Sequence, residues 1–245
     1  HIAIIGGSYA GLAAAKELST PPPAALPYDY AIVAAGSYYP PPMKLSADTM
    51  EEGVRDLAQV RAAIQRAKRI LIVGGGPSGV EAASEIKHYH PEKEVTLFHN
   101  SEQLVDGLSF SRKVHRHIER SLCDMGVELR TKESVLLTET QRLRGFIEET
   151  SVYTTNLGAS IETDLLLVCA GNVRYNTKLI EKLAANTLEE VINAKGEIHV
   201  LPTLQLVPYP HIFAIGDCSD ASPLKLATAA LDQARVCARN IMRLI

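Results

Sequence analysis

The sequence lacks both a cysteine framework and any long apolar run. Its four cysteines, Cys123, Cys169, Cys218 and Cys237, form no C-x-x-C pair and have no zinc-type spacing with histidine. We therefore expect no metal site and no secreted disulfide scaffold, and a reducing compartment fits better. The apolar runs ILIVGG and DLLLVCAG are far shorter than the roughly 18 residues that span a bilayer. They indicate buried parallel strands.

An excess of charge of one sign is also missing. The 25 Lys and Arg residues and 28 Asp and Glu residues are mixed along the chain, for a net charge of −3. Without a basic stripe or an acidic tail, the sequence predicts neither nucleic-acid binding nor a solvating role. The 245 residues are 46% apolar, enough for one large domain or two of ordinary size. No signal peptide is visible, although the missing initial Met leaves room for a trimmed targeting segment.

Predicted strands and helices alternate along the chain, and two glycine-rich turns each follow a strand. This alternation predicts parallel sheets with right-handed crossovers, hence an α/β fold with two Rossmann-like, three-layer nucleotide-binding domains. The predicted strands are 2–5, 28–37, 69–75, 94–98, 127–130, 164–171 and 211–217, and hairpin-like segments occupy 134–157. The predicted helices are 10–18, 49–68, 78–88, 109–125 and 223–243.

The second turn, ILIVGGGPSGVEAA, carries the stronger motif. Gly74, Gly76 and Gly79 match G-x-G-x-x-G directly after an apolar strand and at the start of a helix. The first glycine permits a tight turn, the second lets the backbone approach a pyrophosphate, and the third lets the helix pack on the strand. The helix N-terminus adds N–H donors and a partial positive charge. The alternative is a glycine-rich turn with no ligand.

The partner of this motif is normally an acid at the end of the next strand, which binds the ribose 2′-hydroxyl. The sequence there is LFHNSE, with His99 and Asn100 at the expected place. Without a carboxylate nothing repels a 2′-phosphate, and without an arginine nothing there attracts it. His99 is thus a candidate contact at a site that tolerates both NAD and NADP, or it merely ends an exposed strand.

The first turn, IIGGSYAG, is weaker because Ser8 stands where the middle glycine belongs. Serine is small, caps helices and can donate to a phosphate oxygen, so the change is compatible with binding. The strand HIFAIGD ends in Gly216 and Asp217, at the sheet edge where open α/β sheets bind ligands. Asp217 either accepts hydrogen bonds from a polyol or caps a turn.

Taken together, five stretches resemble the FAD-dependent pyridine nucleotide oxidoreductases, and most closely their apoptosis-inducing-factor-like branch. That branch includes the ferroptosis-suppressor type and is akin to type II NADH dehydrogenases. The resemblance implies an NAD(P)H-binding domain, 61–175, inserted in a discontinuous FAD-binding domain, 1–60 and 176–245. The five stretches are IAIIGGSYAGLAAA, LPYDYAIVAAGS, ILIVGGGPSGVEAASEI, DLLLVCAGNVRYNT and LPTLQLVPYPHIFAIGDCS, in the family's order.

The resemblance also assigns residues to the two cofactors. Glu81 would face the nicotinamide side and Lys225 would stabilise charge on a reduced flavin, or each is simply a solvated charge. The residues implied for FAD are Gly6, Gly7, Ser8, Tyr9, Ala10, Gly11, Gly36, Gly216 and Asp217. Those for NAD(P)H are Gly74, Gly76, Pro77, Ser78, Gly79, Glu81, His99 and Gly171.

Two stretches of the family pattern are missing: the segment after Thr20 that binds the FAD ribose, and a C-terminal domain. The expected reaction takes hydride from NAD(P)H to FAD and passes electrons to a quinone or similar small acceptor. The alternatives are a nucleotide-binding signalling protein with incidental turnover, and a disulfide or ferredoxin reductase. The four cysteines are expected to be buried small hydrophobes. We expect an intracellular protein, cytoplasmic or mitochondrial, with peripheral membrane association compatible with the family and oligomeric state left open.

Overall fold

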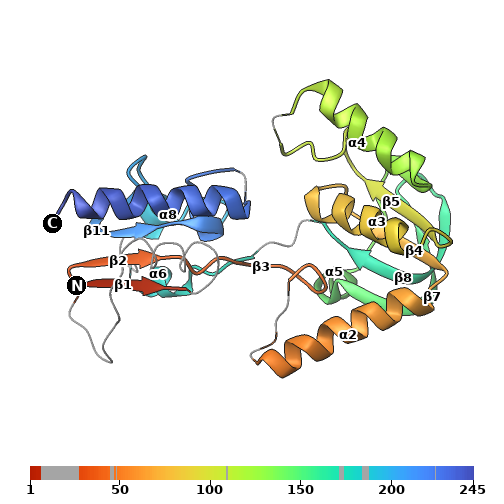
Figure 1. Cartoon of the computed structure of the whole chain (residues 1–245), viewed down its shortest axis with the longest axis horizontal. Helices are drawn as coiled ribbons and strands as arrows, with labels where there is room; N and C mark the ends of the chain where they lie inside the picture. Colours follow the sequence, from red (N-terminus) through yellow and green to blue (C-terminus); the bar gives the residue numbers. More distant parts are fainter. Residues whose placement is uncertain are drawn as a thin grey trace. The chain divides into compact units, whose positions relative to one another are not determined.

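The computed structural model describes residues 1–6, 28–44, 47, 49–108, 110–170, 174–183, 188–223 and 225–245. The chain divides into two compact units: unit 1 is His1–Tyr38 with Val173–Ile245, and unit 2 is Tyr39–Asn172. Figure 1 shows both units as mixtures of helices and strands. The predicted boundary at residue 60 lies inside a helix that belongs to unit 2, and which cofactor each unit binds stays a prediction.

The predicted α/β class is confirmed in unit 2, whose five-stranded sheet has the order β6-β5-β4-β8-β7. Its first four strands are parallel, and β7 pairs antiparallel with β8. The strands are β4 (Arg69–Val73), β5 (Glu94–His99), β6 (Val127–Thr131), β7 (Phe146–Thr154) and β8 (Ser160–Val168). The segment 134–157, predicted as hairpin-like, also contains the short helix α5 (Glu139–Arg144).

The helices of unit 2 begin where local chemistry favours a start. Helix α2 (Met50–Arg66) has a complete capping box between Thr49 and Glu52. Helix α3 (Pro77–Tyr89) has proline in its first turn, where a missing N–H costs nothing. Helix α4 (Arg112–Asp124) begins three residues later than the predicted 109.

Alternation along the central strands builds two cores in unit 2. Ile70, Ile72 and Leu97 pack against the helices, together with Ala83 and Ile86 of α3. Leu71, Phe98 and Leu166 on the opposite side of the sheet form a second cluster with residues of β7. Because both faces are covered, the central strands are continuously apolar, as the runs in the sequence indicated.

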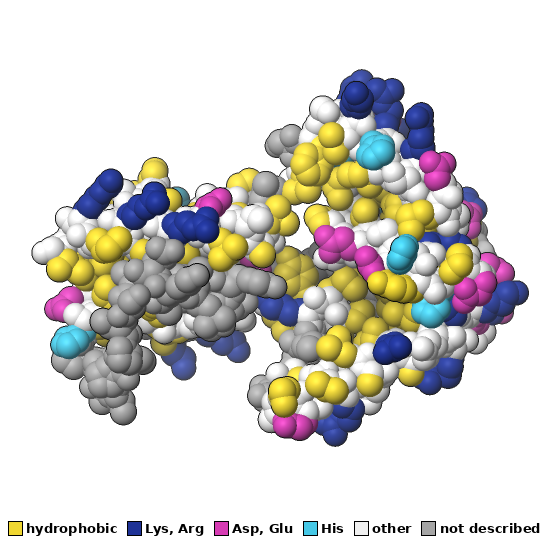
Figure 2. Space-filling model, in the orientation of Figure 1, with side chains coloured by type: hydrophobic (Ala, Val, Ile, Leu, Met, Phe, Trp, Pro, Cys, Tyr) yellow, Lys and Arg dark blue, Asp and Glu magenta, His cyan; other side chains and the backbone are white. Residues whose placement is uncertain are grey.

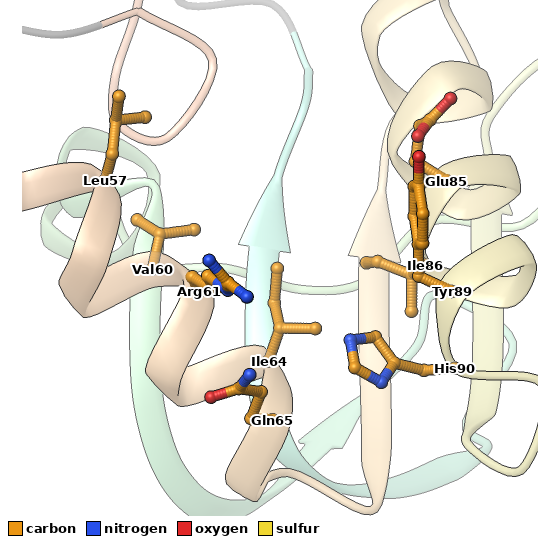
Figure 3. A pocket seen from close by; sticks show the side chains of 9 residues that line it. All are labelled: Leu57, Val60, Arg61, Ile64, Gln65, Glu85, Ile86, Tyr89 and His90. Carbon is orange, nitrogen blue, oxygen red and sulfur yellow. The ribbon is translucent and has the colours of Figure 1, made fainter.

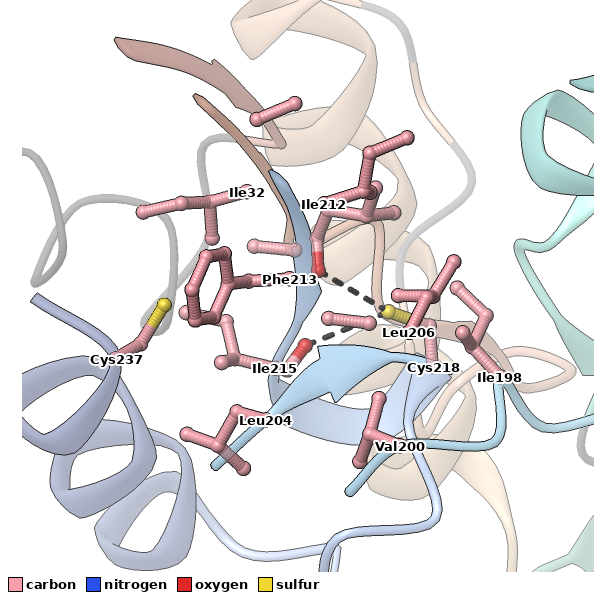
Figure 4. Close-up of a cluster of buried hydrophobic side chains, with 14 of the residues drawn as sticks. Ile32, Ile198, Val200, Leu204, Leu206, Ile212, Phe213, Ile215, Cys218 and Cys237 are labelled. Carbon is pink, nitrogen blue, oxygen red and sulfur yellow. Dashed lines mark hydrogen bonds between the residues drawn. The ribbon is translucent and has the colours of Figure 1, made fainter. Parts of the chain in front are cut away.

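Unit 1 has a four-stranded sheet of order β1-β2-β11-β10, in which β1, β2 and β11 are parallel and β10 is antiparallel to β11. Its core lies between β2, β11 and the last helix, where Ile32, Phe213, Ala234 and Cys237 are fully buried (Figure 4). The strands are β1 (Ile2–Ile5), β2 (Tyr30–Val33), β10 (Gln205–Leu206) and β11 (Tyr209–Ala214). The helix is α8 (Ala227–Met242).

Several short elements of unit 1 have no counterpart among the predicted ones. Strands β3 (Ser37–Tyr38) and β9 (Arg174–Tyr175) form a two-stranded antiparallel sheet. The others are α6 (Lys178–Leu183), α7 (Leu188–Val191) and the 3₁₀ turn η1 (Gly216–Cys218). The predicted helix 10–18 lies outside the described residues. In the described part of the chain, no helix is both long and apolar enough to cross a bilayer.

Candidate nucleotide-binding sites

The glycine-rich turn of unit 2 lies at the carboxyl edge of its parallel sheet. It follows β4, between the ends of the neighbouring strands β5 and β8. The N–H of Gly74 donates to the carbonyl of Phe98, and the N–H of Cys169 donates to the carbonyl of Val73. An open α/β sheet binds its ligands at this edge.

Two of the three motif glycines are required by packing within the protein. Gly74 has φ +115°, and a Cβ there would lie 2.7 Å from the backbone carbon of Cys169. A Cβ on Gly79 would lie 1.8 Å from the carbonyl oxygen of Gly74. Any larger residue would therefore push the helix away from the strand, as the sequence predicted for the third glycine.

The middle glycine differs from the other two. Gly76 is the N-cap of α3, with φ −73°, and a Cβ built there would have no atom within 4 Å. Neither backbone conformation nor packing requires glycine at this position. Gly76 has no side chain to cap the helix, and the first N–H groups of a helix have no partner within it. Pro77 and Ser78 follow in the first turn. The turn thus fits a pyrophosphate that approaches the backbone closely.

The structure corrects the picture of His99 as the end of an exposed strand. The side chain is only 8% exposed and lies under the turn. Its Nδ1 accepts a hydrogen bond from the N–H of Gly75 at 3.2 Å, and its Nε2 lies 3.4 Å from Oδ1 of Asp106. A side-chain hydrogen bond from Ser101 holds the pKa of Asp106 below its usual range, and the neighbouring His99 acts in the same direction. Sequence reasoning missed Asp106 because it lies seven residues beyond the strand.

Glu81 and Gly171 are the remaining residues predicted to bind NAD(P)H. Glu81 is exposed in the second turn of α3, so it lies beyond the first turn where the helix dipole acts most strongly. Gly171 lies outside the described residues. The predicted roles of both residues stay predictions.

The turn of unit 1 begins in the same way as that of unit 2. Gly6 follows β1 with φ +112°, and a Cβ there would lie 2.2 Å from the carbonyl oxygen of Ala34, just after β2. The predicted FAD residues Gly7, Ser8, Tyr9, Ala10 and Gly11 lie outside the described residues.

Asp217 lies at the same edge of the unit 1 sheet, since it follows β11. Its Oδ2 accepts a hydrogen bond of 2.6 Å from the hydroxyl of Ser37, which is buried. The preceding Gly216 has φ +73°, and its N–H donates to Oε1 of Gln233 at 2.7 Å. Gly36, with φ +70°, directly precedes Ser37. Ser37 and Gln233 thus fix the predicted FAD-binding turn. Neither was among the predicted site residues, although Ser37 directly follows one of them, Gly36.

Lys225, predicted to act on the flavin, lies in a buried ion pair. Its Nζ lies 2.8 Å from Oε1 of Glu197 and 5.4 Å from the ring centre of Tyr175, and it also donates to the carbonyl of Ser219. Burial raises the pKa of Glu197, but the hydrogen bonds from Lys225 and Asn193 outweigh it, so the pKa lies below the ordinary value. The lysine already has a structural partner, and its catalytic role stays a prediction.

All four cysteines are free thiols. Burial raises the pKa of Cys169 and of Cys237 to about 12, and it also raises that of Cys218. A thiol with a raised pKa is a poor nucleophile at neutral pH. The prediction of four buried cysteines is right for Cys218 and Cys237, whereas Cys169 is half-buried and Cys123 is exposed.

A groove of about 500 Å³ lies between α2 and the C-terminal half of α3, away from Gly76. Figure 2 shows apolar side chains gathered in this hollow. Figure 3 shows Val60 and Ile64 of α2 opposite Ile86 and Tyr89 of α3. Since the groove flanks the opposite end of α3, it does not belong to the glycine-rich site.

Comparison with known proteins agrees with this geometry. The chain is 32% identical to ferroptosis suppressor protein 1 of Homo sapiens over 219 residues, which are 89% of this chain and 57% of that protein. It is 29% identical to apoptosis-inducing factor homolog A of Dictyostelium discoideum, over 88% of this chain and 55% of that protein. The chain spans little more than half the length of these relatives.

Solved structures show the same fold. A FAD-dependent pyridine nucleotide-disulphide oxidoreductase from Desulfovibrio vulgaris matches with a TM-score of 0.65 and 22% identity, over 99% of this chain and 71% of that one. The water-forming NADH oxidase of Lactobacillus brevis bound to NADH matches with a TM-score of 0.62 and 24% identity, over 87% of this chain and 46% of that one.

The family model of the pyridine nucleotide-disulphide oxidoreductases matches residues 20–234. The match spans both units described above, including the intact glycine-rich turn after β4 and the Gly-Asp turn after β11. The predicted resemblance is confirmed, and the predicted cofactor pair, FAD and NAD(P)H, is confirmed at the level of the family. The chain belongs to the pyridine nucleotide-disulphide oxidoreductases.

Proposed function

We propose that this protein is an FAD-dependent oxidoreductase that takes hydride from NAD(P)H and passes electrons to a quinone or a similar small acceptor. In this proposal unit 2 binds NAD(P)H and unit 1 binds FAD. When bound, the two cofactors supply the hydride chemistry, and the chain's residues bind, orient and shield them.

The observation that carries the proposal is the contrast among the motif glycines of unit 2. Packing explains glycine at positions 74 and 79, but a Cβ at Gly76 would meet nothing. A glycine that the fold does not need, at the N-terminus of a helix and at the carboxyl edge of a parallel sheet, supports close approach of a pyrophosphate.

On the FAD side, support comes from the Gly-Asp turn after β11. In the described part of the chain, the hydroxyl of Ser37 donates to Oδ2 of Asp217. A carboxylate has several acceptor sites, so this bond leaves others for a ligand. The carboxylate is therefore suited to accept hydrogen bonds from a polyol such as the flavin's ribityl chain.

The proposed acceptor rests on the cysteines and on the family resemblance. A disulfide relay uses a pair of reactive thiols, whereas Cys169, Cys218 and Cys237 are free thiols whose pKa values burial raises. A small acceptor that takes electrons directly from the flavin needs no such pair. The resemblance to the quinone-reducing branch of the family supports a quinone or a similar small acceptor.

The test is an anaerobic visible spectrum of the purified full-length protein before and after addition of NADH or NADPH. We expect a yellow protein whose flavin absorbance bleaches on reduction and returns when a short-chain ubiquinone analogue is added. A colourless protein that still binds NAD(P)H would overturn the proposal and favour a nucleotide-binding signalling role. If glutathione disulfide or ferredoxin reoxidised the flavin faster than the quinone did, the proposed quinone acceptor would be wrong, and a disulfide or ferredoxin reductase would be favoured.

A further inference from the structure

The loop after β5 folds back against the glycine-rich turn and brings Asp106 beside His99, the last residue of β5. The N–H of Val105 donates to the carbonyl of Gly75 at 2.8 Å, and a Cβ on Gly75 would lie 2.4 Å from the side chain of Leu104. Loop and turn are therefore packed without a gap. Asp106 follows directly, with its carboxylate beside the His99 ring.

The His99 ring is held between the turn and this loop. Its Nδ1 receives the Gly75 N–H at 3.2 Å, so Nδ1 carries no proton in this arrangement. Its Nε2 is buried, and among the described residues no group has hydrogen-bond geometry to it. The nearest charge is Oδ1 of Asp106 at 3.4 Å, which favours the tautomer with its proton on Nε2.

Gly75 is the middle residue of the turn. Its N–H points at His99, its carbonyl binds Val105, and its peptide neighbour Gly76 begins the open cradle at the α3 N-terminus. With the N–H of Gly75 bonded to His99 and its carbonyl bonded to Val105, both peptide planes that flank Gly75 are restrained, including the plane that carries the Gly76 N–H. The N–H groups at the start of α3 are thereby preorganised, and a preorganised donor binds an anion better than a donor that must first be ordered.

We propose that His99 is a positioning residue for the nucleotide: as the Nε2–H tautomer set by Asp106, it fixes the Gly75 peptide and thereby the N–H groups that meet the pyrophosphate. This inference rests on the proposed nucleotide site of unit 2. It replaces the ribose contact that the sequence suggested for His99 with a role beneath the turn.

Two substitutions of His99 separate its hydrogen-bond acceptor from its bulk. In His99→Asn the amide oxygen occupies the place of Nδ1 and accepts the same hydrogen bond, whereas His99→Leu keeps the bulk and removes the acceptor. An unsatisfied buried N–H costs about 1 to 3 kcal/mol. Because the turn escapes that cost by reorienting Gly75, we expect a roughly tenfold weaker NADH affinity for His99→Leu and an affinity within about twofold of the wild type for His99→Asn.

His115→Leu is the matched control. His115 is also buried, and its Nδ1 contacts the carbonyl of Leu104 at 2.8 Å, so it supports the same loop without contacting the turn. This variant should lose stability comparable to that of His99→Leu and retain its NADH affinity. Without Asp106 the His99 ring populates both neutral tautomers, and Nδ1 accepts the hydrogen bond from Gly75 in only one of them. Asp106→Ala should therefore weaken NADH binding, but less than His99→Leu, which removes the acceptor altogether.

The measurement is the NADH dissociation constant of the full-length protein by titration calorimetry, with thermal unfolding of each variant and ¹⁵N spectra of the histidine rings. The expected spectrum of His99 is that of a neutral ring with its proton on Nε2. Three results would each overturn the inference. They are an NADH affinity of His99→Leu equal to that of the wild type, an equal loss of affinity in His99→Asn and His99→Leu, and a loss of affinity in His115→Leu equal to that in His99→Leu. If the wild type itself binds no NADH or NADPH, the proposed function fails instead.

Discussion

The first glycine of the turn in unit 1 and that in unit 2 meet the same obstacle. Gly6 has φ +112° and faces the carbonyl of Ala34, and Gly74 has φ +115° and faces the backbone of Cys169. In both units the obstacle follows the strand that lies beside the turn's own strand in the sheet, β2 and β8 respectively. The same geometric solution thus occurs twice, in two units with different sheets.

The two turns differ in their support on the other side. In unit 2, β5 flanks β4 and contributes His99, which fixes the next peptide. In unit 1, β1 has a single neighbour among the described strands, β2. The first glycine of each turn is therefore required by the fold, whereas Gly76, the second motif glycine of unit 2, is not constrained by packing. Ser8, which the motif places at the corresponding position of unit 1, lies outside the described residues.

The largest effect is expected from Gly6→Ala and Gly74→Ala, which test whether the two turns are equivalent. Each substitution forces a Cβ into backbone at a positive φ. Backbone strain of about 1 to 3 kcal/mol and overpacking of about 1 to 3 kcal/mol add to a loss of about 2 to 6 kcal/mol. Urea unfolding followed by circular dichroism would measure it. A tolerated Gly6→Ala beside a damaging Gly74→Ala would break the equivalence.

A second comparison contrasts the buried lysines of the two units. Lys225 of unit 1 pairs with Glu197, whereas Lys93 of unit 2 donates to the carbonyls of Gln65 and Ala67. Lys225→Met would leave a buried carboxylate unpaired and should cost about 3 kcal/mol. Lys93→Met leaves two neutral carbonyls and the exposed carboxylate of Glu92, which lies 3.9 Å from Nζ, and should cost about 1 to 2 kcal/mol.

The double variant Lys225→Met, Glu197→Leu is the control for that pair, measured by the same urea unfolding. It should recover most of the loss, because replacing both partners of a buried pair with apolar groups is often nearly neutral. A double variant as unstable as Lys225→Met alone would contradict the ion-pair explanation.

The same pair makes stability depend on pH. Because the pKa of Glu197 lies below its ordinary value of 4.5 in the folded protein, its contribution is fully present above about pH 4.5 and is lost as the pH falls through the folded pKa. Between pH 6 and pH 3, wild-type stability should therefore fall more than that of the double variant. The free energy of unfolding of both proteins would be measured by urea unfolding across this range. If the two curves were parallel, the Lys225–Glu197 pair would not contribute to the pH dependence of stability.

The elements that could be predicted from sequence are those with strong local patterns. The apolar run before Gly74 predicted β4, and the glycine-rich turn after it predicted the start of α3 to within one residue. Helix α5 was missed although its capping box, Thr138 with Gln141, is written in the sequence. That signal was outweighed by the β-branched residues on both sides of it.

The site could be predicted only in part, for a physical reason. The motif placed Gly74, Gly76 and Gly79 at the turn, but no local pattern says which of them packing requires. The inward direction of His99 depends on space left by the missing Cβ of Gly75. The contact from Ser37 to Asp217 joins residues 180 positions apart. Such contacts arise from topology, which spacing along the chain does not reveal.

Gly76→Ala sharpens the contrast between fold and ligand. Since the new Cβ meets nothing, stability should change by no more than about 1 kcal/mol, the cost of alanine at an N-cap. The methyl group would instead stand in the path of a pyrophosphate, and we expect NADH affinity to fall at least about tenfold, or about 1.4 kcal/mol. Calorimetry with thermal unfolding separates the two quantities. Unchanged affinity in a stable variant would remove the main support for the proposed site.

The smallest effect on cofactor binding is expected from Ser37→Ala, which probes unit 1 as Gly76→Ala probes unit 2. Loss of the hydroxyl removes one hydrogen bond of 2.6 Å to Asp217, and a hydrogen bond to a charged group contributes about 1.5 kcal/mol. The carboxylate then gains rotational freedom where FAD is proposed to bind. FAD retention after gel filtration, compared with that of Ser37→Thr, which keeps the hydroxyl, should fall several-fold for alanine alone. Equal retention in both variants would mean that Asp217 is held by the Gly216 backbone and its bond to Gln233, and not by Ser37.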